Sequence, residues 1–207
     1  MKKSTIDKEE KKAFNFDTLK SFFKSSVPED PAMKIFISNL FMRTFKKGEI
    51  IKNANEEDLY LNIIVKGSAG LFVHNGRHNI CITLFYEHDF LCDYLSLLKQ
   101  EKTSIQLVAL EHIELQSIEY SKLRKINESS ITAAKIAKTV AEHLYIQKQE
   151  ELIHMLTLTP VERYKKMLEE RPDILRRTPL KILSSYLGVT PESLSRLRKT
   201  YYQKNSV

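Results

Sequence analysis

The residues whose types and spacing could do chemistry lie in one run near the C-terminus, between Thr190 and Lys199. Glu192 and Arg196 are four residues apart, so on an α-helix they share one face. Helices of this kind enter the major groove of DNA with their N-terminal end first. The predicted DNA-contact set is Thr190, Glu192, Ser193, Ser195, Arg196 and Lys199. This run therefore predicts a surface that reads base edges of double-stranded DNA.

Each charged residue of this run also has a simpler interpretation. Glu192 in a first helical turn interacts favourably with the helix dipole. Arg196 could contact a phosphate only, and Lys199 could contact either a phosphate or a base edge. These alternatives stay open at the level of sequence.

The elements that position this run match a helix-turn-helix over Leu180–Lys199. Gly188 falls where the turn needs a residue that tolerates positive φ, and Val189 follows as an apolar anchor. Thr190-Pro191 is typical of a helix start, with Thr as N-cap and Pro at the first helical position. The inward positions of the two helices are Leu183, Leu187, Leu194 and Leu197. An ordinary surface pair of antiparallel helices is the alternative.

Two further helices are predicted upstream, and a third signal marks the start of the first helix of the helix-turn-helix. A long helix runs from about Ser129 to Met155, and we expect it to dimerise through Ile136, Val140 and Leu144. Gln147, Lys148 and Glu151 interrupt its apolar stripe, so a helix packed within one subunit is the alternative. A capping box at Thr159–Glu162 predicts a helix to about Arg171, and Thr178-Pro179 predicts the start of the next one.

The first half of the chain changes from a helical period, over about Asn15–Phe41, to a period of two. Asn75-Gly76 predicts a two-residue hairpin in which His74 pairs with Arg77. The expected strands cover about 59–65, 71–74, 77–85, 105–110 and 113–118, with a turn between Gly67 and Gly70. The predicted fold class is α+β: an antiparallel β-roll or jelly roll over 1–128, a dimerisation helix over 129–156, and an all-α, winged-helix-like helix-turn-helix domain over 157–207.

Charge and composition narrow the function class. The chain has a net charge of +7, and its last 51 residues contain eleven Lys or Arg against five Asp or Glu. Concentrated positive charge beside a groove-sized helix favours phosphate binding. No signal-like leader, membrane-length apolar run or assembled catalytic set is evident, so we expect a cytoplasmic protein that is not an enzyme and has no membrane partner.

The order of parts and several segments resemble the Crp/Fnr transcription regulators. FKKGEII at 45–51, DLYLNIIVKGSAGLF at 58–72 and HDFLCDYLSLL at 88–98 are similar to the family's cyclic-nucleotide-binding-type barrel. Residues 171–199 are similar to its DNA-binding end, in a Bacteroidetes-like form. The resemblance implies that Glu192 accepts from a cytosine amino group and that Arg196 donates two hydrogen bonds to guanine, while Pro191 stands where the family has a base-contacting Arg. The resemblance implies a homodimer that reads an inverted-repeat operator, with RNA polymerase as a further partner to consider. A ligand-binding or protein-interaction module that no longer reads DNA is the alternative function.

The resemblance also implies an effector pocket at Cys92, Asp93, Lys102, Thr103 and Ser104. Cyclic-nucleotide-binding members have a Gly-Glu pair and an Arg followed by a small residue at these places; here they are Cys92-Asp93 and Thr103-Ser104. Thr103 cannot pair with a phosphate as an Arg does, and Lys102 would point the other way on a strand. We therefore expect that cyclic AMP is not the effector.

The remaining metal-type and redox-type residues leave the presence and identity of a cofactor undecided. His74 and His78 face different partners in the predicted hairpin, which argues against a metal pair. The other four histidines, His88, His112, His143 and His154, have no spacing that selects a haem ligand. Cys81 is expected in the core, and Cys92 is a weak redox candidate.

Overall fold

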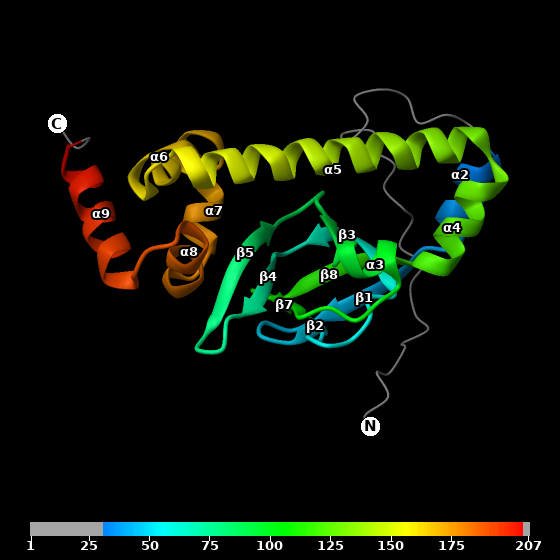
Figure 1. Cartoon of the computed structure of the whole chain (residues 1–207), viewed down its shortest axis with the longest axis horizontal. Helices are drawn as coiled ribbons and strands as arrows, with labels where there is room; N and C mark the ends of the chain where they lie inside the picture. The colour runs from blue at the N-terminus through cyan, green and yellow to red at the C-terminus, as the bar shows by residue number, and fades with distance from the viewer. Residues whose placement is uncertain (1–30, 205–207) are drawn as a thin grey trace.

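The structure, a computed structural model, describes residues 31–204, with side chains described as far as Lys199. A strand-rich body is followed by one long helix, which crosses it and ends in a group of short helices (Figure 1). This arrangement confirms the predicted fold class. The predicted helical region from Asn15 is seen only as α2 (Pro31–Ser38), because its earlier part lies outside the described residues.

The body is a roll of two four-stranded antiparallel sheets. One sheet has the order β1-β8-β3-β6 and the other has the order β2-β7-β4-β5. Their bounds are β1 Phe41–Phe45, β2 Ile50–Lys52, β3 Tyr60–Lys66, β4 Ala69–His74, β5 Asn79–Phe85, β6 Phe90–Leu91, β7 Ile105–Ala109 and β8 Ile113–Glu119. A short helix, α3 (Tyr94–Lys99), lies between β6 and β7.

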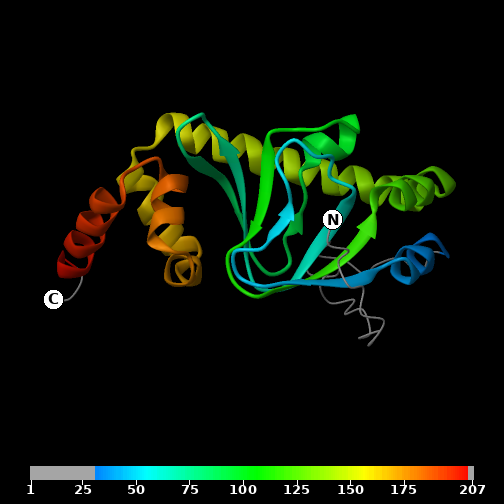
Figure 2. The same ribbon diagram turned by 90° about the horizontal axis from the view of Figure 1, so that it is seen from below.

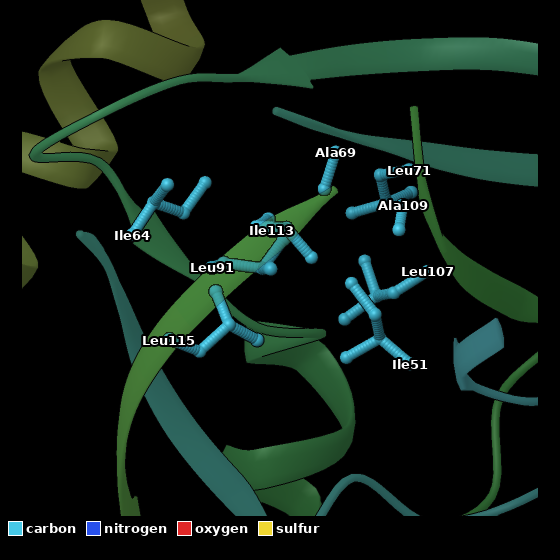
Figure 3. Packing of buried hydrophobic residues seen from close by; sticks show 9 residues of the cluster. All are labelled: Ile51, Ile64, Ala69, Leu71, Leu91, Leu107, Ala109, Ile113 and Leu115. Carbon is cyan, nitrogen blue, oxygen red and sulfur yellow. The ribbon is translucent and has the colours of Figure 1, made fainter. Parts of the chain in front are cut away.

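The interior of the roll is filled by apolar side chains from both sheets (Figure 3). One sheet contributes Ile64, Leu91, Ile113 and Leu115, and the other contributes Ile51, Ala69, Leu71, Leu107 and Ala109. Each is at most 9% exposed. Alternation of side chains along the strands places these residues on the two inner faces, so the period of two seen in the sequence corresponds to this core.

The hairpin between β4 and β5 differs from its prediction. His74 pairs with Asn79 instead of Arg77, so the loop has four residues, 75–78. The side-chain oxygen of Asn75 accepts hydrogen bonds from the backbone N–H groups of Arg77 (3.1 Å) and His78 (3.0 Å). The Asn75 side chain thus satisfies the turn itself and stabilises a longer loop than the Asn-Gly pair predicted.

The long helix and the helices that begin near Thr159, Thr178 and Thr190 lie close to their predicted boundaries, whereas α4 and α7 were not predicted. The long helix is α5 (Ile131–Thr157), preceded by a separate helix, α4 (Tyr120–Ser129). The C-terminal helices are α6 (Pro160–Glu170), α7 (Pro172–Arg177), α8 (Leu180–Leu187) and α9 (Pro191–Lys204). In both views they lie beside the roll at the end of α5, with α9 farthest from the roll (Figures 1 and 2). The division at 128 and 156 into three units stays a prediction.

Two predicted helix starts have different outcomes. The capping box is confirmed, because the Thr159 hydroxyl accepts from the Glu162 N–H and the Glu162 carboxylate accepts from the Thr159 N–H. Thr178 does not cap α8, since its hydroxyl donates to the Ile174 carbonyl and pairs with the Tyr86 hydroxyl. Tertiary contact has replaced the local capping role of Thr178.

Among the described helices, none is both long enough and apolar enough to cross a bilayer.

Candidate nucleic-acid interface and effector site

The helix-turn-helix is held by a small apolar core of its own. Its fully or almost fully buried members are Tyr164, Leu175, Leu183, Leu187 and Leu194, which are at most 5% exposed. Val189 and Leu197 pack against them from the turn and from α9. The apolar spacing in the sequence therefore corresponds to one packed unit of α6, α7, α8 and α9.

The turn between α8 and α9 depends on Gly188. This residue has φ of +69°, in the left-handed region that side chains disfavour. A Cβ built at this position would meet only the Arg163 Nη2 atom, at 3.7 Å, so the backbone conformation requires glycine and the available space does not.

Arg163 joins the same turn to the end of α5, a role that the sequence did not reveal. Its guanidinium donates to the Leu158 carbonyl and to the Leu187 carbonyl, both at 2.6 Å. These carbonyls belong to helix C-termini, which favour a cation. Arg163 therefore links α6 to the long helix and to the helix-turn-helix turn.

The first turn of α9 is capped as predicted. The Thr190 hydroxyl accepts from the Ser193 N–H at 3.2 Å and donates to the Ser193 hydroxyl at 3.1 Å. Pro191 occupies the first helical position, where no N–H is needed. Thr190 and Ser193 are thus engaged with each other at the tip of the helix.

The outward face of α9 is formed by Glu192, Ser195, Arg196 and Lys199, all of which are exposed. The pKa of Glu192 is lowered, first by its own backbone N–H, then by the Thr190 hydroxyl and by the charge of Arg196. Glu192 is therefore an ionised acceptor at the N-terminal end of α9. The structure brings these predicted residues together on one solvent-facing surface, with charge of both signs.

At least three of the eleven basic residues in the C-terminal region make contacts within the chain. Arg163 bonds helix carbonyls, and Arg198 donates to the Leu175 carbonyl at 2.9 Å. Arg177 pairs with two carboxylates of the roll. A count of charges along the sequence therefore overstates the cations that face outward.

The helix-turn-helix is docked on the β5 side of the roll. Arg177 contacts Glu87 at 2.8 Å and Glu111 at 2.5 Å, and the pKa of Glu87 is lowered to about 2, chiefly by the hydrogen bond from Arg177. The Ser185 hydroxyl of α8 accepts from the Cys81 N–H of β5 at 3.0 Å. Charge and hydrogen bonds between residues distant in sequence fix the position of α8.

The predicted effector residues are joined by a lysine that the sequence pattern did not indicate. The Lys52 ammonium lies 2.8 Å from Asp93 Oδ2, from Thr103 Oγ1 and from the Ile105 carbonyl oxygen. The Thr103 hydroxyl also donates to Asp93. Lys52 and Asp93 have side chains only 4% and 0% exposed, so this is a buried ion pair.

A second carboxylate completes the network. Asp58 Oδ2 accepts from the Asp93 N–H at 2.7 Å, and the Asp58 N–H donates to the Ser96 hydroxyl at 2.9 Å. Asp93 Oδ1 accepts from the Ser96 N–H, which caps α3. Burial raises the pKa of Asp58 above its usual value, although N–H donors and Lys52 act in the opposite direction. We call these five residues, Lys52, Asp58, Asp93, Ser96 and Thr103, the clasp.

The other predicted effector residues lie outside the clasp. Lys102 and Ser104 are exposed, on either side of Thr103, as expected for neighbours in extended chain. Cys92 is buried and its pKa is raised well above the usual value by burial, which disfavours a reactive thiolate. The structure thus brings together Asp93 and Thr103 but not Lys102 or Ser104.

The predicted dimer residues of α5 face their own subunit. Ile136 and Val140 pack against Met33, Ile63 and Phe90. Ile136, Val140 and Leu144 also line an apolar cavity of about 240 Å³ between α5, α2 and the roll. These contacts follow the alternative of a helix packed within one subunit.

The opposite face of α5 has a different apolar stripe toward its C-terminus. Its members, the outer stripe, are Tyr145, Ile146, Leu152, Ile153 and Leu156, which are 47–76% exposed. They recur at steps of three, four and seven residues, as on one side of a helix. The apolar residues of the outer stripe are visible in the sequence. They could not be assigned to a separate face, because their helical period overlaps with that of Ile136, Val140 and Leu144.

The remaining histidine and cysteine candidates make structural contacts. His74 Nδ1 lies 3.0 Å from the Asn79 side-chain oxygen, across the strand pair. Cys81 is 2% exposed, and burial raises its pKa to about 12. Within residues 31–204, no group of three His, Cys, Asp or Glu side chains is placed to hold a metal ion.

Comparison with known proteins gives likeness of structure only. No protein-family model and no curated sequence matches the chain significantly. FixK2 from Bradyrhizobium japonicum superposes with a TM-score of 0.69 at 15% identity, over 80% of this chain and 85% of that one. A protein from Eubacterium rectale described as a Crp/Fnr-family regulator gives 0.67 at 16% identity, over 90% and 88%.

A third solved structure is described as the c-di-GMP-responsive global regulator CLP of Xanthomonas campestris. It superposes with a TM-score of 0.64 at 15% identity, over 84% of this chain and 91% of that one. Each of the three likenesses covers at least 80% of the chain, more than the roll alone provides. The chain therefore has the fold of Crp/Fnr transcription regulators, as the sequence resemblance predicts.

Proposed function

We propose that the chain is a sequence-specific regulator of transcription that binds double-stranded DNA through α9. The supporting observation is the outward face of α9, where Glu192 and Arg196 are exposed above a packed helix-turn-helix. A recognition helix enters the major groove with its N-terminal residues toward the base edges. Glu192 and Arg196 have the chemistry to read cytosine and guanine, respectively.

The protein is proposed to act as a homodimer, since a two-fold protein suits an inverted-repeat operator. The outer stripe is the better candidate contact, because Ile136 and Val140 already pack on their own roll. Two copies of α5 joined along the outer stripe would bury its exposed apolar side chains. Dimerisation therefore uses the same helix that we expected, through its other face.

Selection of bound duplexes from a random DNA pool tests the proposal. We expect an inverted-repeat consensus with half-sites about one helical turn apart. Recovery of no consensus, with weak and equal binding to all duplexes, would instead favour the alternative of a roll-based interaction module. Under that outcome, α9 would be a surface helix and its Glu192 and Arg196 would not affect binding.

The dimer contact is tested by two matched pairs of substitutions. Ile153→Asp with Leu156→Asp should give monomers by light scattering while the roll stays folded, because both side chains are exposed in one subunit. Ile136→Asp with Val140→Asp should instead lower the unfolding temperature, because it places charges against the roll. If only the second pair yields folded monomers, the originally expected face is the contact.

A further inference from the structure

We propose that Lys52 is a built-in occupant of the predicted effector position, and that it closes this position to nucleotides and other anionic ligands. An ammonium has three N–H donors. Lys52 directs them to Asp93, Thr103 and the Ile105 carbonyl, each at 2.8 Å. No donor remains for a phosphate, so a ligand would have to displace an internal partner.

The acceptors at this position are occupied as well. Asp93 accepts from Lys52 and Thr103 through Oδ2 and from the Ser96 N–H through Oδ1. A ribose hydroxyl would therefore compete with three donors already in place. The Thr103 hydroxyl is engaged in turn by Lys52 and by Asp93. The Lys52 and Asp93 charges are almost fully buried. Separating them would leave each charge buried without a partner, which is energetically unfavourable.

The clasp also joins the two sheets of the roll. Lys52 ends β2 and Thr103 precedes β7, in one sheet. Asp93 follows β6 and Asp58 precedes β3, in the other sheet. The interior of the roll is filled by the apolar core (Figure 3). The clasp is therefore a structural connection between the sheets, at the position where the resemblance implies a ligand.

Ligand binding by the roll can be measured without DNA, so the result is independent of whether α9 binds DNA. Calorimetric titration of the full chain with cyclic AMP, cyclic GMP, c-di-GMP and inorganic phosphate should give no saturable heat. The ¹⁵N signal of the Lys52 ammonium should show slow proton exchange and should not move on addition of any of these probes. A micromolar dissociation constant, accompanied by loss of the protected Lys52 signal, would overturn the proposal.

Substitution tests the clasp itself. Lys52→Met keeps the length of the side chain but leaves Asp93 buried without its cation, so the unfolding temperature should fall by about 10 °C. Lys66→Met, at an exposed lysine of β3, is the matched control and should change it by less than about 2 °C. Equal effects of the two substitutions would overturn the proposal.

A second variant keeps the test decisive if Lys52→Met does not fold. Adding Asp93→Asn to Lys52→Met removes the unpaired charge, while Asn can still cap α3. The double variant should recover a large part of the lost unfolding temperature, because the two residues are coupled. If the double variant is no more stable than Lys52→Met, or likewise does not fold, Lys52 and Asp93 do not act as a pair and the proposal fails.

Discussion

Two pairs of a carboxylate and a cation, one on α9 and one in the roll, differ in their surroundings. Glu192 and Arg196 are exposed on α9, whereas Lys52 and Asp93 are buried 2.8 Å apart between the sheets of the roll. Exposed charges retain hydration that a partner can replace, and buried charges depend on the internal groups that already neutralise them. The helix-turn-helix thus presents its charges to solvent, whereas the roll uses its buried charges in contacts within the chain.

The largest effect is expected from a substitution in the apolar core that supports the exposed charges of α9. Leu194 is 0% exposed in the core of the helix-turn-helix, so Leu194→Ala should lower the free energy of unfolding of this region by about 2–5 kcal/mol. Denaturant unfolding and a DNA-binding assay measure the two consequences. Val161→Ala, at a side chain 46% exposed on α6, is the control and should change stability by about 0.5 kcal/mol or less. Similar losses in the two variants would mean that Leu194 is not part of the supporting core.

Removal of a base-reading group should have the next largest effect. Arg196→Ala should weaken operator binding by about 1–3 kcal/mol and reduce the base preference at one base pair of each half-site. Glu192→Ala should reduce the base preference at a different base pair. Arg198→Ala is the comparison, because Arg198 donates to the Leu175 carbonyl and its removal should lower stability without changing base preference. Binding to operator and to scrambled duplexes separates the outcomes. If Arg196→Ala weakens both duplexes equally, Arg196 contacts a phosphate.

The helix-turn-helix could be predicted from the sequence because its signals are local. Gly188, Thr190-Pro191 and the leucine spacing each follow from backbone conformation, capping or helical period within twenty residues. Strand alternation predicted the main strands of the roll for the same reason. The strands β2 and β6 and the helices α3 and α7 have too few residues for a period to be visible. Length does not explain why β1, as long as β7, and the ten-residue α4 were not predicted.

The clasp could not be predicted, because its members are brought together only by folding. Lys52 and Asp93 are 41 residues apart, and their contact depends on the stacking of the two sheets. The same reason applies to Arg177, which contacts Glu87 from 90 residues away. On α5, the helical period predicted a packed face, but which stripe faces the roll depends on where α2 and the roll lie.

The contact between the two regions should be sensitive to acid. Arg177 lowers the pKa of Glu87 to about 2 in the folded chain, from an ordinary value near 4.5, so the stability contributed by this pair is present above about pH 4.5 and is lost as pH falls through about 2. Both side chains are about 30% exposed, so solvent screening should reduce the contribution to about 1 kcal/mol. Glu87→Gln should therefore lower the free energy of unfolding by about this amount at pH 7, and the difference from the unaltered chain should narrow on acidification. For Glu169→Gln, at an exposed residue of α6, the difference in free energy of unfolding from the unaltered chain should not change on acidification. If the difference for Glu87→Gln is also constant at all pH values, the proposed role of Glu87 is contradicted.

The smallest expected effect distinguishes a phosphate contact from a base contact on the outward face of α9. Lys199 is exposed two helical turns beyond Glu192, where the helix leaves its N-terminal reading end. If Lys199 touches only a phosphate, Lys199→Ala should weaken binding to the operator and to a scrambled duplex by the same amount. The magnitude of the negative slope of log K against log salt should decrease by about 1 for each phosphate that is no longer neutralised. A salt series on both duplexes measures this slope, with Lys135→Ala on α5 as an exposed-lysine control that should leave it unchanged. If Lys199→Ala weakens the operator alone, Lys199 reaches a base edge, and the reading face extends one turn further along α9 than Glu192 and Arg196 define.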